Sequence, residues 1–141
     1  MSEALAFDHV AASVADLERS QAFYAVALGF VCTEHAFTLP AHDIRGLVLL
    51  NDAGVRLELF ERRGSVPMAR KGHPTEGALR QGWFQFALAT RDLDATFARV
   101  VACGAEPILT PRIAPDGRTR IAFVGDPDGN LVELVQRQSG P

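Results

Sequence analysis

The stretch His9–Leu17, HVAASVADL, is echoed 76 residues later by Gln85–Leu93, QFALATRDL. A second pair repeats at almost the same interval, because Leu57–Leu59 (LEL) returns 75 residues later as Val132–Leu134 (VEL). The longer stretches both open on a polar residue and both end on Asp-Leu. Self-similarity at a fixed interval indicates two copies of one structural module.

Four potential metal ligands occupy matching positions in the two copies. His9 precedes Glu58 by 49 residues, and Gln85 precedes Glu133 by 48. Imidazole nitrogens and carboxylate or amide oxygens all bind divalent metals in proteins. We therefore expect each copy to bring one pair of ligands to an equivalent place in its module.

Composition and charge limit the class of protein. The 141 residues suit one domain, or two small modules that share a core. The net charge of −3 argues against nucleic acid or an acidic membrane surface as partner, and no apolar run approaches the roughly 20 residues of a membrane helix. Met1–Leu5 lacks the features of a secretory signal. Because Cys32 and Cys103 are too few for a disulfide scaffold, we expect reduced thiols and a cytoplasmic protein.

Each copy shows the pattern of a strand, a helix and three further strands. Asp16 and Asp92 precede the helical stretches as caps, and Gly29 and Gly104 follow them as stop signals. The expected strands are 7–14, 30–37, 44–51, 55–61, 83–90, 107–113, 119–124 and 131–136, and the expected helices are 16–28 and 92–103.

These patterns predict a single α+β domain over residues 1–141. It contains a first βαβββ module at 5–61, a linker loop at 62–81 that is long enough to act as a lid or a binding loop, and a second βαβββ module at 82–137. The two modules are expected to form a curved, barrel-like mixed sheet around a central metal or ligand site, with the helices outside.

Strand alternation places all four candidate ligands on the face opposite the helices, because their apolar neighbours form the helix-facing set. Small residues such as Ala11 and Ala87 share the opposite face and leave room for a ligand. A buried carboxylate is costly unless a cation compensates it. Three explanations stay open: a divalent metal bound by both glutamates, pairing with arginines, or exposure of the glutamates to solvent in the wall of a cavity. By parity the candidate arginines are Arg45, Arg56, Arg112 and Arg120.

The sequence resembles the vicinal oxygen chelate superfamily, which includes glyoxalase I, methylmalonyl-CoA epimerase, extradiol dioxygenases and the fosfomycin and bleomycin resistance proteins. The resemblance covers about residues 7 to 137. It is carried by Asp8–Val10, Asp16–Glu18, Phe23-Tyr24 with Leu28–Phe30, Leu57–Phe60, Asp92–Asp94, and Asp126–Asn130 with Val132–Leu134.

The resemblance implies that His9, Glu58, Gln85 and Glu133 bind one divalent metal ion, which could be Zn, Ni, Co, Mn or Fe. It further implies a glyoxalase-like lyase or isomerase that deprotonates the carbon next to a carbonyl, with the enolate stabilised by the metal. Glu133, or else Glu58, would act as general base. Family members commonly pair, so we expect a homodimer, in which the ligands come from one chain or from two.

The resemblance leaves the substrate open. Phe60–Gly64 stands where glyoxalase I carries an Asn-Trp-Gly stretch, so use of a thiol cofactor is also open. We expect the small-molecule substrate to contact four side chains, namely Arg45, Arg56, Phe60 and Arg120.

A non-catalytic protein of the antibiotic-resistance type, which binds a small molecule, is the alternative. Phe37, Phe60 and Trp83 could supply stacking surface for such a ligand. The basic linker, with Arg62-Arg63, Arg70-Lys71 and His73, could hold an anionic group or could simply be solvated. Stoichiometric metal would distinguish the enzyme from the binder.

Overall fold

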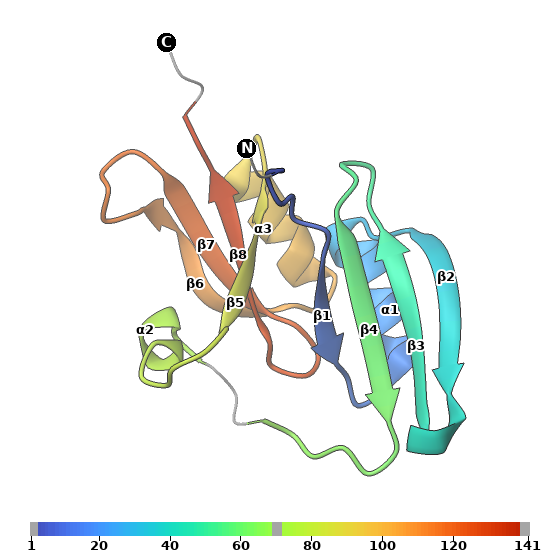
Figure 1. The fold of residues 1–141 in the computed structure, drawn as a ribbon. Helices are drawn as coiled ribbons and strands as arrows, with labels where there is room; N and C mark the ends of the chain where they lie inside the picture. The colour runs from blue at the N-terminus through green and yellow to red at the C-terminus, as the bar shows by residue number, and fades with distance from the viewer. Residues whose placement is uncertain (1–2, 69–71, 139–141) are drawn as a thin grey trace. The chain divides into compact units, whose positions relative to one another are not determined.

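The fold is described from a computed structural model, which covers residues 3–68 and 72–138. The chain divides into two compact units, residues 1–66 and 67–141. Each unit has its own four-stranded mixed sheet and its own long helix (Figure 1). The predicted α+β class with two βαβββ modules is confirmed.

In the first unit the sheet order is β1-β4-β3-β2. β1 runs parallel to β4, and the other neighbouring pairs are antiparallel. The helix α1 lies against one face of this sheet (Figure 1). The elements are β1 (His9–Ser13), α1 (Leu17–Leu28), β2 (Cys32–Leu39), a 3-10 turn (Pro40–His42), β3 (Ile44–Leu50) and β4 (Arg56–Arg62).

The second unit repeats this topology with the order β5-β8-β7-β6, in which β5 is parallel to β8. A short helix, α2, precedes the repeat in the segment expected to be the linker. The elements are α2 (Pro74–Gly77), β5 (Gln85–Ala89), α3 (Leu93–Ala102), β6 (Glu106–Ile113), β7 (Arg120–Gly125) and β8 (Leu131–Gln136).

Local chemistry fixes the ends of the two long helices. The carboxylates of Asp16 and Asp92 accept hydrogen bonds from the backbone N–H groups of Arg19 and Ala95, which a helix otherwise leaves unpaired. Gly29 ends α1 in the left-handed region at φ 77°, which a glycine adopts without steric cost. The predicted caps and the stop at Gly29 are therefore confirmed.

The core of each unit lies between its helix and its sheet. In the first unit, Leu57 and Leu59 of β4 are fully buried beside Tyr24 of α1, whose ring packs edge-on against Phe23 and Phe30. In the second unit the corresponding side chains are Val132 and Leu134 of β8 with Leu93 and Val100 of α3. The helix-facing parity inferred for β4 and β8 is thus confirmed, and the candidate glutamates between these residues take the opposite parity.

Within the described residues, no helix combines the length and the apolar character that a membrane span requires. The loop role expected for 62–81 stays a prediction, and Arg70 and Lys71 lie outside the described residues.

Candidate functional site

The first unit brings His9 and Glu58 together. Because β1 is parallel to β4 with Ala11 opposite Glu58, the His9 side chain lies beside the glutamate on the same sheet face. The His9 Nε2 atom is 3.0 Å from the Glu58 Oε2 atom. The other ring nitrogen, Nδ1, is 2.7 Å from the Asp8 carboxylate. On β1 the exposed positions are His9, Ala11 and Ser13, which places this face away from the buried core.

The second unit brings Gln85 and Glu133 together in the same register, with Ala87 opposite Glu133. The Gln85 Nε2 group donates a hydrogen bond of 2.8 Å to Glu133 Oε2. The amide oxygen, Gln85 Oε1, is buried and has no hydrogen-bond partner among the described residues. The spacing inferred from the sequence therefore corresponds, within each unit, to one contacting pair of side chains.

The two pairs differ in electrostatics. Burial raises the pKa of the Glu133 carboxyl, and the nearby Arg137 charge and the Gln85 hydrogen bond offset part of this rise. The pKa of the His9 imidazole is also raised, chiefly because the Asp8 carboxylate stabilises its charged form by hydrogen bonding, with a further contribution from Glu58. The Asp8 pKa is lowered by the same hydrogen bond.

Each pair has nitrogen or oxygen atoms that can bind a divalent cation. His9 Nε2 and Glu58 Oε2 form one set, and Gln85 Oε1 and Glu133 form the other. The unpartnered Gln85 Oε1 atom fits a cation, because a buried acceptor without a donor is costly and a metal ion would satisfy it. The residues present therefore fit the metal that the sequence resemblance implies.

Arg56 and Phe60 flank Glu58 on β4 and share its face by parity. The Arg56 guanidinium forms a bidentate ion pair with Glu34, with Nε 2.9 Å from Glu34 Oε2. The Phe60 ring contacts Phe37 edge-on, with the ring centroids 5.3 Å apart. This sheet face therefore carries an ion pair on one side of Glu58 and an aromatic pair on the other.

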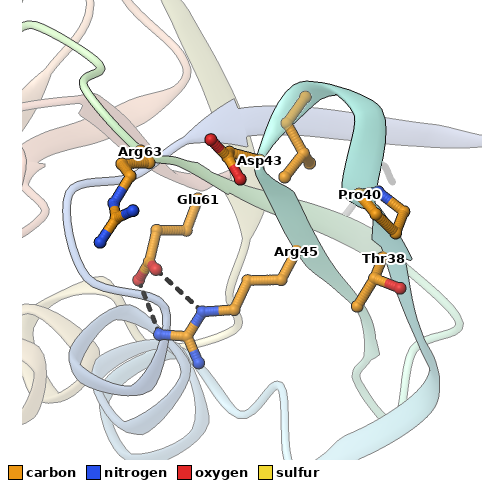
Figure 2. Close-up of a pocket in the computed structure, with 7 residues that line it drawn as sticks. Thr38, Pro40, Asp43, Arg45, Glu61 and Arg63 are labelled. Atoms are coloured by element: carbon orange, nitrogen blue, oxygen red, sulfur yellow. Dashed lines mark hydrogen bonds and ion pairs between the residues drawn. The ribbon is translucent and has the colours of Figure 1, made fainter.

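Arg45 lies on the helix side of the sheet, which differs from the placement that parity suggested. Its guanidinium pairs with Glu18 of α1 and with Glu61 at the end of β4, at N–O distances of 2.5 and 2.8 Å. Figure 2 shows Arg45 and Glu61 paired along the wall of a shallow pocket of about 380 Å³ that Arg63 and Asp43 also line. The donors of Arg45 are thus used within the first unit.

Arg120 repeats this arrangement in the second unit. It pairs with Asp94 of α3 at 2.6 Å and contacts Gln136 at the end of β8. The two strand residues that contact these arginines, Glu61 and Gln136, also accept a hydrogen bond from the first backbone N–H of the helix. The Leu17 N–H donates to Glu61 at 2.7 Å, and the Leu93 N–H donates to Gln136 at 3.1 Å. Arg45 and Arg120 therefore tie the helix start to the sheet. The contact of these two arginines with substrate stays a prediction.

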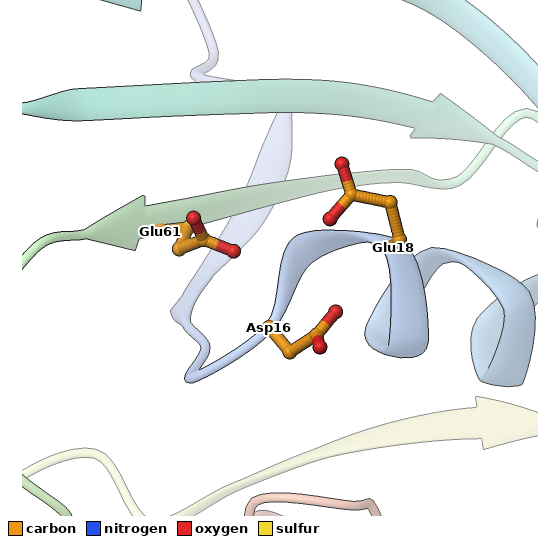
Figure 3. Close-up of side chains that lie close together, drawn as sticks. All are labelled: Asp16, Glu18 and Glu61. Carbon is orange, nitrogen blue, oxygen red and sulfur yellow. The ribbon is translucent and has the colours of Figure 1, made fainter.

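Asp16, Glu18 and Glu61 form an acidic cluster at the start of α1 (Figure 3). Each carboxylate already has a partner. Asp16 caps the helix, Glu18 pairs with Arg45, and Glu61 pairs with Arg45 and the Leu17 N–H. The hydrogen bonds from Arg45 lower the pKa of both Glu18 and Glu61. Because Arg45 pairs with two of the three carboxylates and the helix N-terminus takes the third, the cluster is an ion-pair and capping network at the helix start.

Sequence reasoning overlooked Asp8 and Glu34, which contact His9 and Arg56. Asp8 could have been identified from the sequence, because a carboxylate next to a candidate ligand histidine commonly forms a hydrogen bond to that histidine in metal sites. Glu34 could not have been identified in this way, because it lies on a different strand from Arg56 and the sequence does not show that the two meet. Of the other basic candidates, Arg112 bonds to Thr110 of its own strand, and His73 caps α2.

Comparisons with known proteins identify the family of this chain. The model of the Glyoxalase/Bleomycin resistance protein/Dioxygenase superfamily matches residues 6–134. An Escherichia coli (strain K12) protein, named Uncharacterized protein YaeR, is 30% identical over 129 residues, which make up 92% of this chain and 94% of that protein. A protein of Vibrio cholerae serotype O1, named Probable lactoylglutathione lyase, is 29% identical over 136 residues, 92% of this chain and 89% of that protein.

Among solved structures, glyoxalase I from Zea mays superposes with a TM-score of 0.75 at 25% identity. The match covers 95% of this chain and 45% of the maize protein, so this chain spans less than half the length of that relative. The family match extends over nearly all of both units. This chain therefore belongs to the glyoxalase/bleomycin resistance protein/dioxygenase superfamily.

Proposed function

We propose that this protein is a metal-dependent, glyoxalase-like lyase or isomerase. It would remove a proton from the carbon next to a carbonyl in a small oxygenated substrate. Members of the superfamily generally use a divalent metal, and one relative of nearly full length bears the name Probable lactoylglutathione lyase.

One observation carries the proposal, the buried and unpartnered Gln85 Oε1 atom beside Glu133. A buried polar atom without a partner costs about 1–3 kcal/mol. Turning the amide around would direct this oxygen toward an ionised Glu133 carboxylate, so the exchange of the two amide atoms does not remove the problem. A divalent cation would satisfy the amide oxygen and the carboxylate together.

His9 and Glu58 of the first unit, with Gln85 and Glu133 of the second, are the proposed ligands of one ion. The two pairs would come from one chain or from the two chains of a homodimer. When bound, the cation would supply a Lewis acid that stabilises negative charge on a substrate oxygen.

The protein's own groups would move the proton. Glu133 is the proposed general base, because its contact in the structure is a neutral amide that can be exchanged for substrate, whereas Glu58 lies against the His9 ring. Phe60 and Arg56, on the face that carries Glu58, are the proposed substrate contacts. The cytoplasm remains the expected compartment.

Metal content per chain is the decisive measurement, made by mass spectrometry on wild type and on the Glu58→Gln and Glu133→Gln variants. Glu3→Gln, at an exposed position near the N-terminus, is the matched control. We expect about one divalent ion per chain in wild type and in the control, and a large loss in both site variants. The metal-loaded protein would then be assayed on 2-oxo and 2-hydroxy compounds, with and without a thiol that forms hemithioacetals. Wild type that binds no metal after reconstitution would refute the mechanism.

The second candidate is a non-catalytic protein that binds a small molecule. The aromatic pair Phe37–Phe60 favours it, since this pair lies on the candidate ligand face and needs no metal to bind an apolar ring. Trp83, which is 99% exposed, is a further stacking surface. The same metal measurement separates the two functions. The enzyme should bind a metal ion and lose it when Glu133 becomes glutamine, whereas the non-catalytic protein should bind no metal in either form.

A further inference from the structure

Asp8 contacts the one candidate ligand whose coordination depends on where a proton sits. The Asp8 Oδ2 atom is 2.7 Å from His9 Nδ1, and Glu58 Oε2 is 3.0 Å from Nε2. A neutral imidazole has one N–H donor and one bare nitrogen, and only the bare nitrogen can bind a metal. With a carboxylate at each nitrogen, the partner that holds the N–H decides which nitrogen is left bare.

We propose that Asp8 positions the His9 ring for metal binding by keeping the proton on Nδ1 and so directing the bare Nε2 toward Glu58. This inference rests on the function proposed above. Asp8 is a positioning residue, since it acts through His9 and does not itself reach the metal. An outer carboxylate of this kind fixes both the tautomer and the orientation of a ligand histidine.

The internal repeat supports the assignment. The position that corresponds to Asp8 in the second unit is Phe84, and the ligand that follows it is Gln85. An amide has a fixed acceptor oxygen and no tautomer to select, so it needs no outer carboxylate. The Phe84 side chain instead packs toward α2, where a Cβ atom added at Gly77 would lie 2.8 Å from its ring. The carboxylate is therefore present in the copy that has the imidazole and absent from the copy that has the amide.

The neighbouring charges suit this role. Arg56 lies directly opposite His9 in the parallel strand pair, and its donors are used by Glu34, so it leaves the Asp8 carboxylate to His9. The Asp8 side chain is 73% exposed, so its hydrogen bond contributes little to the stability of the fold. A positioning role and a structural role can therefore be separated by experiment.

The test uses the Asp8→Ala and Asp8→Asn variants of the full chain. The control is Asp43→Asn, which removes the same charge at the other end of β4, where Ile44 pairs with Arg62. Zinc affinity is measured by competition with a chelator, and the His9 tautomer by nitrogen-15 NMR of the metal-free protein at a pH where the ring is neutral. Urea unfolding monitors stability.

We expect Asp8→Ala to lower zinc affinity about 10- to 100-fold and to move the His9 proton from Nδ1 toward Nε2, with the urea midpoint unchanged. Asp8→Asn keeps an acceptor oxygen, so it should retain the Nδ1–H tautomer and lose less affinity. Asp43→Asn should match wild type. Wild type that carries its proton on Nε2, or Asp8→Ala that binds zinc as tightly as wild type, overturns this inference alone. Wild type that binds none of Zn, Ni, Co, Mn or Fe overturns the proposed function and this inference with it.

Discussion

Replacing Gly46 with alanine should disturb the aromatic pair next to Glu58 without touching any candidate ligand. Gly46 lies in β3 between Phe37 and Phe60, its partners on the two neighbouring strands. The Phe37 ring covers it so closely that a Cβ atom at position 46 would overlap the ring tip and lie 2.7 Å from both Cε atoms. The absence of a side chain at position 46 thus allows Phe37 to reach Phe60.

The magnitude follows from two opposing contributions. The ring must move until its Cζ and both Cε atoms lie at least 3.4 Å from the new Cβ, and overpacking of this kind costs about 1–3 kcal/mol. Gly46 does not have a positive φ, so alanine also removes backbone freedom from the unfolded chain and returns about 0.5–1 kcal/mol. We expect Gly46→Ala to lower the free energy of unfolding by about 1 kcal/mol.

A double-mutant cycle in urea tests the cause. In a Phe37→Ala background the steric cost disappears, so Gly46→Ala should become neutral or slightly stabilising, with a coupling energy of about 1–3 kcal/mol. Zinc affinity should stay at the wild-type value in every variant of the cycle, because His9 and Glu58 are unchanged. An equal cost of Gly46→Ala in both backgrounds would refute the reasoning.

Three further predictions concern acidic side chains that hold turns and helix starts. Asp126 is 3% exposed and accepts hydrogen bonds from the Asp128 and Asn130 backbone and from the Asn130 amide, so Asp126→Ala should destabilise the protein by on the order of 3 kcal/mol in urea, and a loss below 1 kcal/mol would contradict this. Asp16→Ala and Asp92→Ala each remove a helix cap worth about 1 kcal/mol. Asp16→Ala should cost less stability, because it also relieves repulsion between Asp16 and the carboxylates of Glu18 and Glu61. Thermal unfolding compares the two variants, and a larger loss of stability for Asp16→Ala would contradict the expectation. Hydrogen bonds from Thr119 and from the Arg118 and Thr119 backbone lower the pKa of Asp116 to about 2, so its contribution to stability is complete above about pH 4 and is lost as the pH falls through 2. The stability difference between wild type and Asp116→Asn in urea should accordingly shrink from pH 5 to pH 2, and a constant difference would argue against the shift.

Sequence alone could predict those parts of the fold that local chemistry determines. Asp16 and Gly29 bound α1 because a cap and a left-handed residue act within a few positions of their own place in the chain. Leu57 and Leu59 flank Glu58, so alternation placed the glutamate on the face opposite the helix. The contacts within each ligand pair agree with the repeat, because the two copies have nearly equal spacing, 49 and 48 residues, and the same strand register.

Arg45 shows where such reasoning ends. β3 has apolar side chains on both faces, with Leu47 and Leu49 on one and Val48 and Leu50 on the other, so alternation alone could not say which face its arginine joins. The answer came from Glu18, an acid on α1 that is far from Arg45 in sequence and close to it only after folding. Irregular pairing is equally hidden, as with the register shift between Thr33 and His35 in β2.

The parallel pairing of β1 with β4 has a consequence for how the protein is made. These are the first and last strands of their unit, so His9 can meet Glu58 only after the 49 residues that follow His9 have been synthesised. Closing a loop of that length costs more entropy than pairing strands joined by a short turn, and such non-local contacts slow folding. A truncated chain that ends before β4 would retain the imidazole and have no carboxylate opposite it. A ligand that bridges His9 and Glu58 can therefore bind only chains whose first unit is complete. Binding would stabilise those chains against local unfolding.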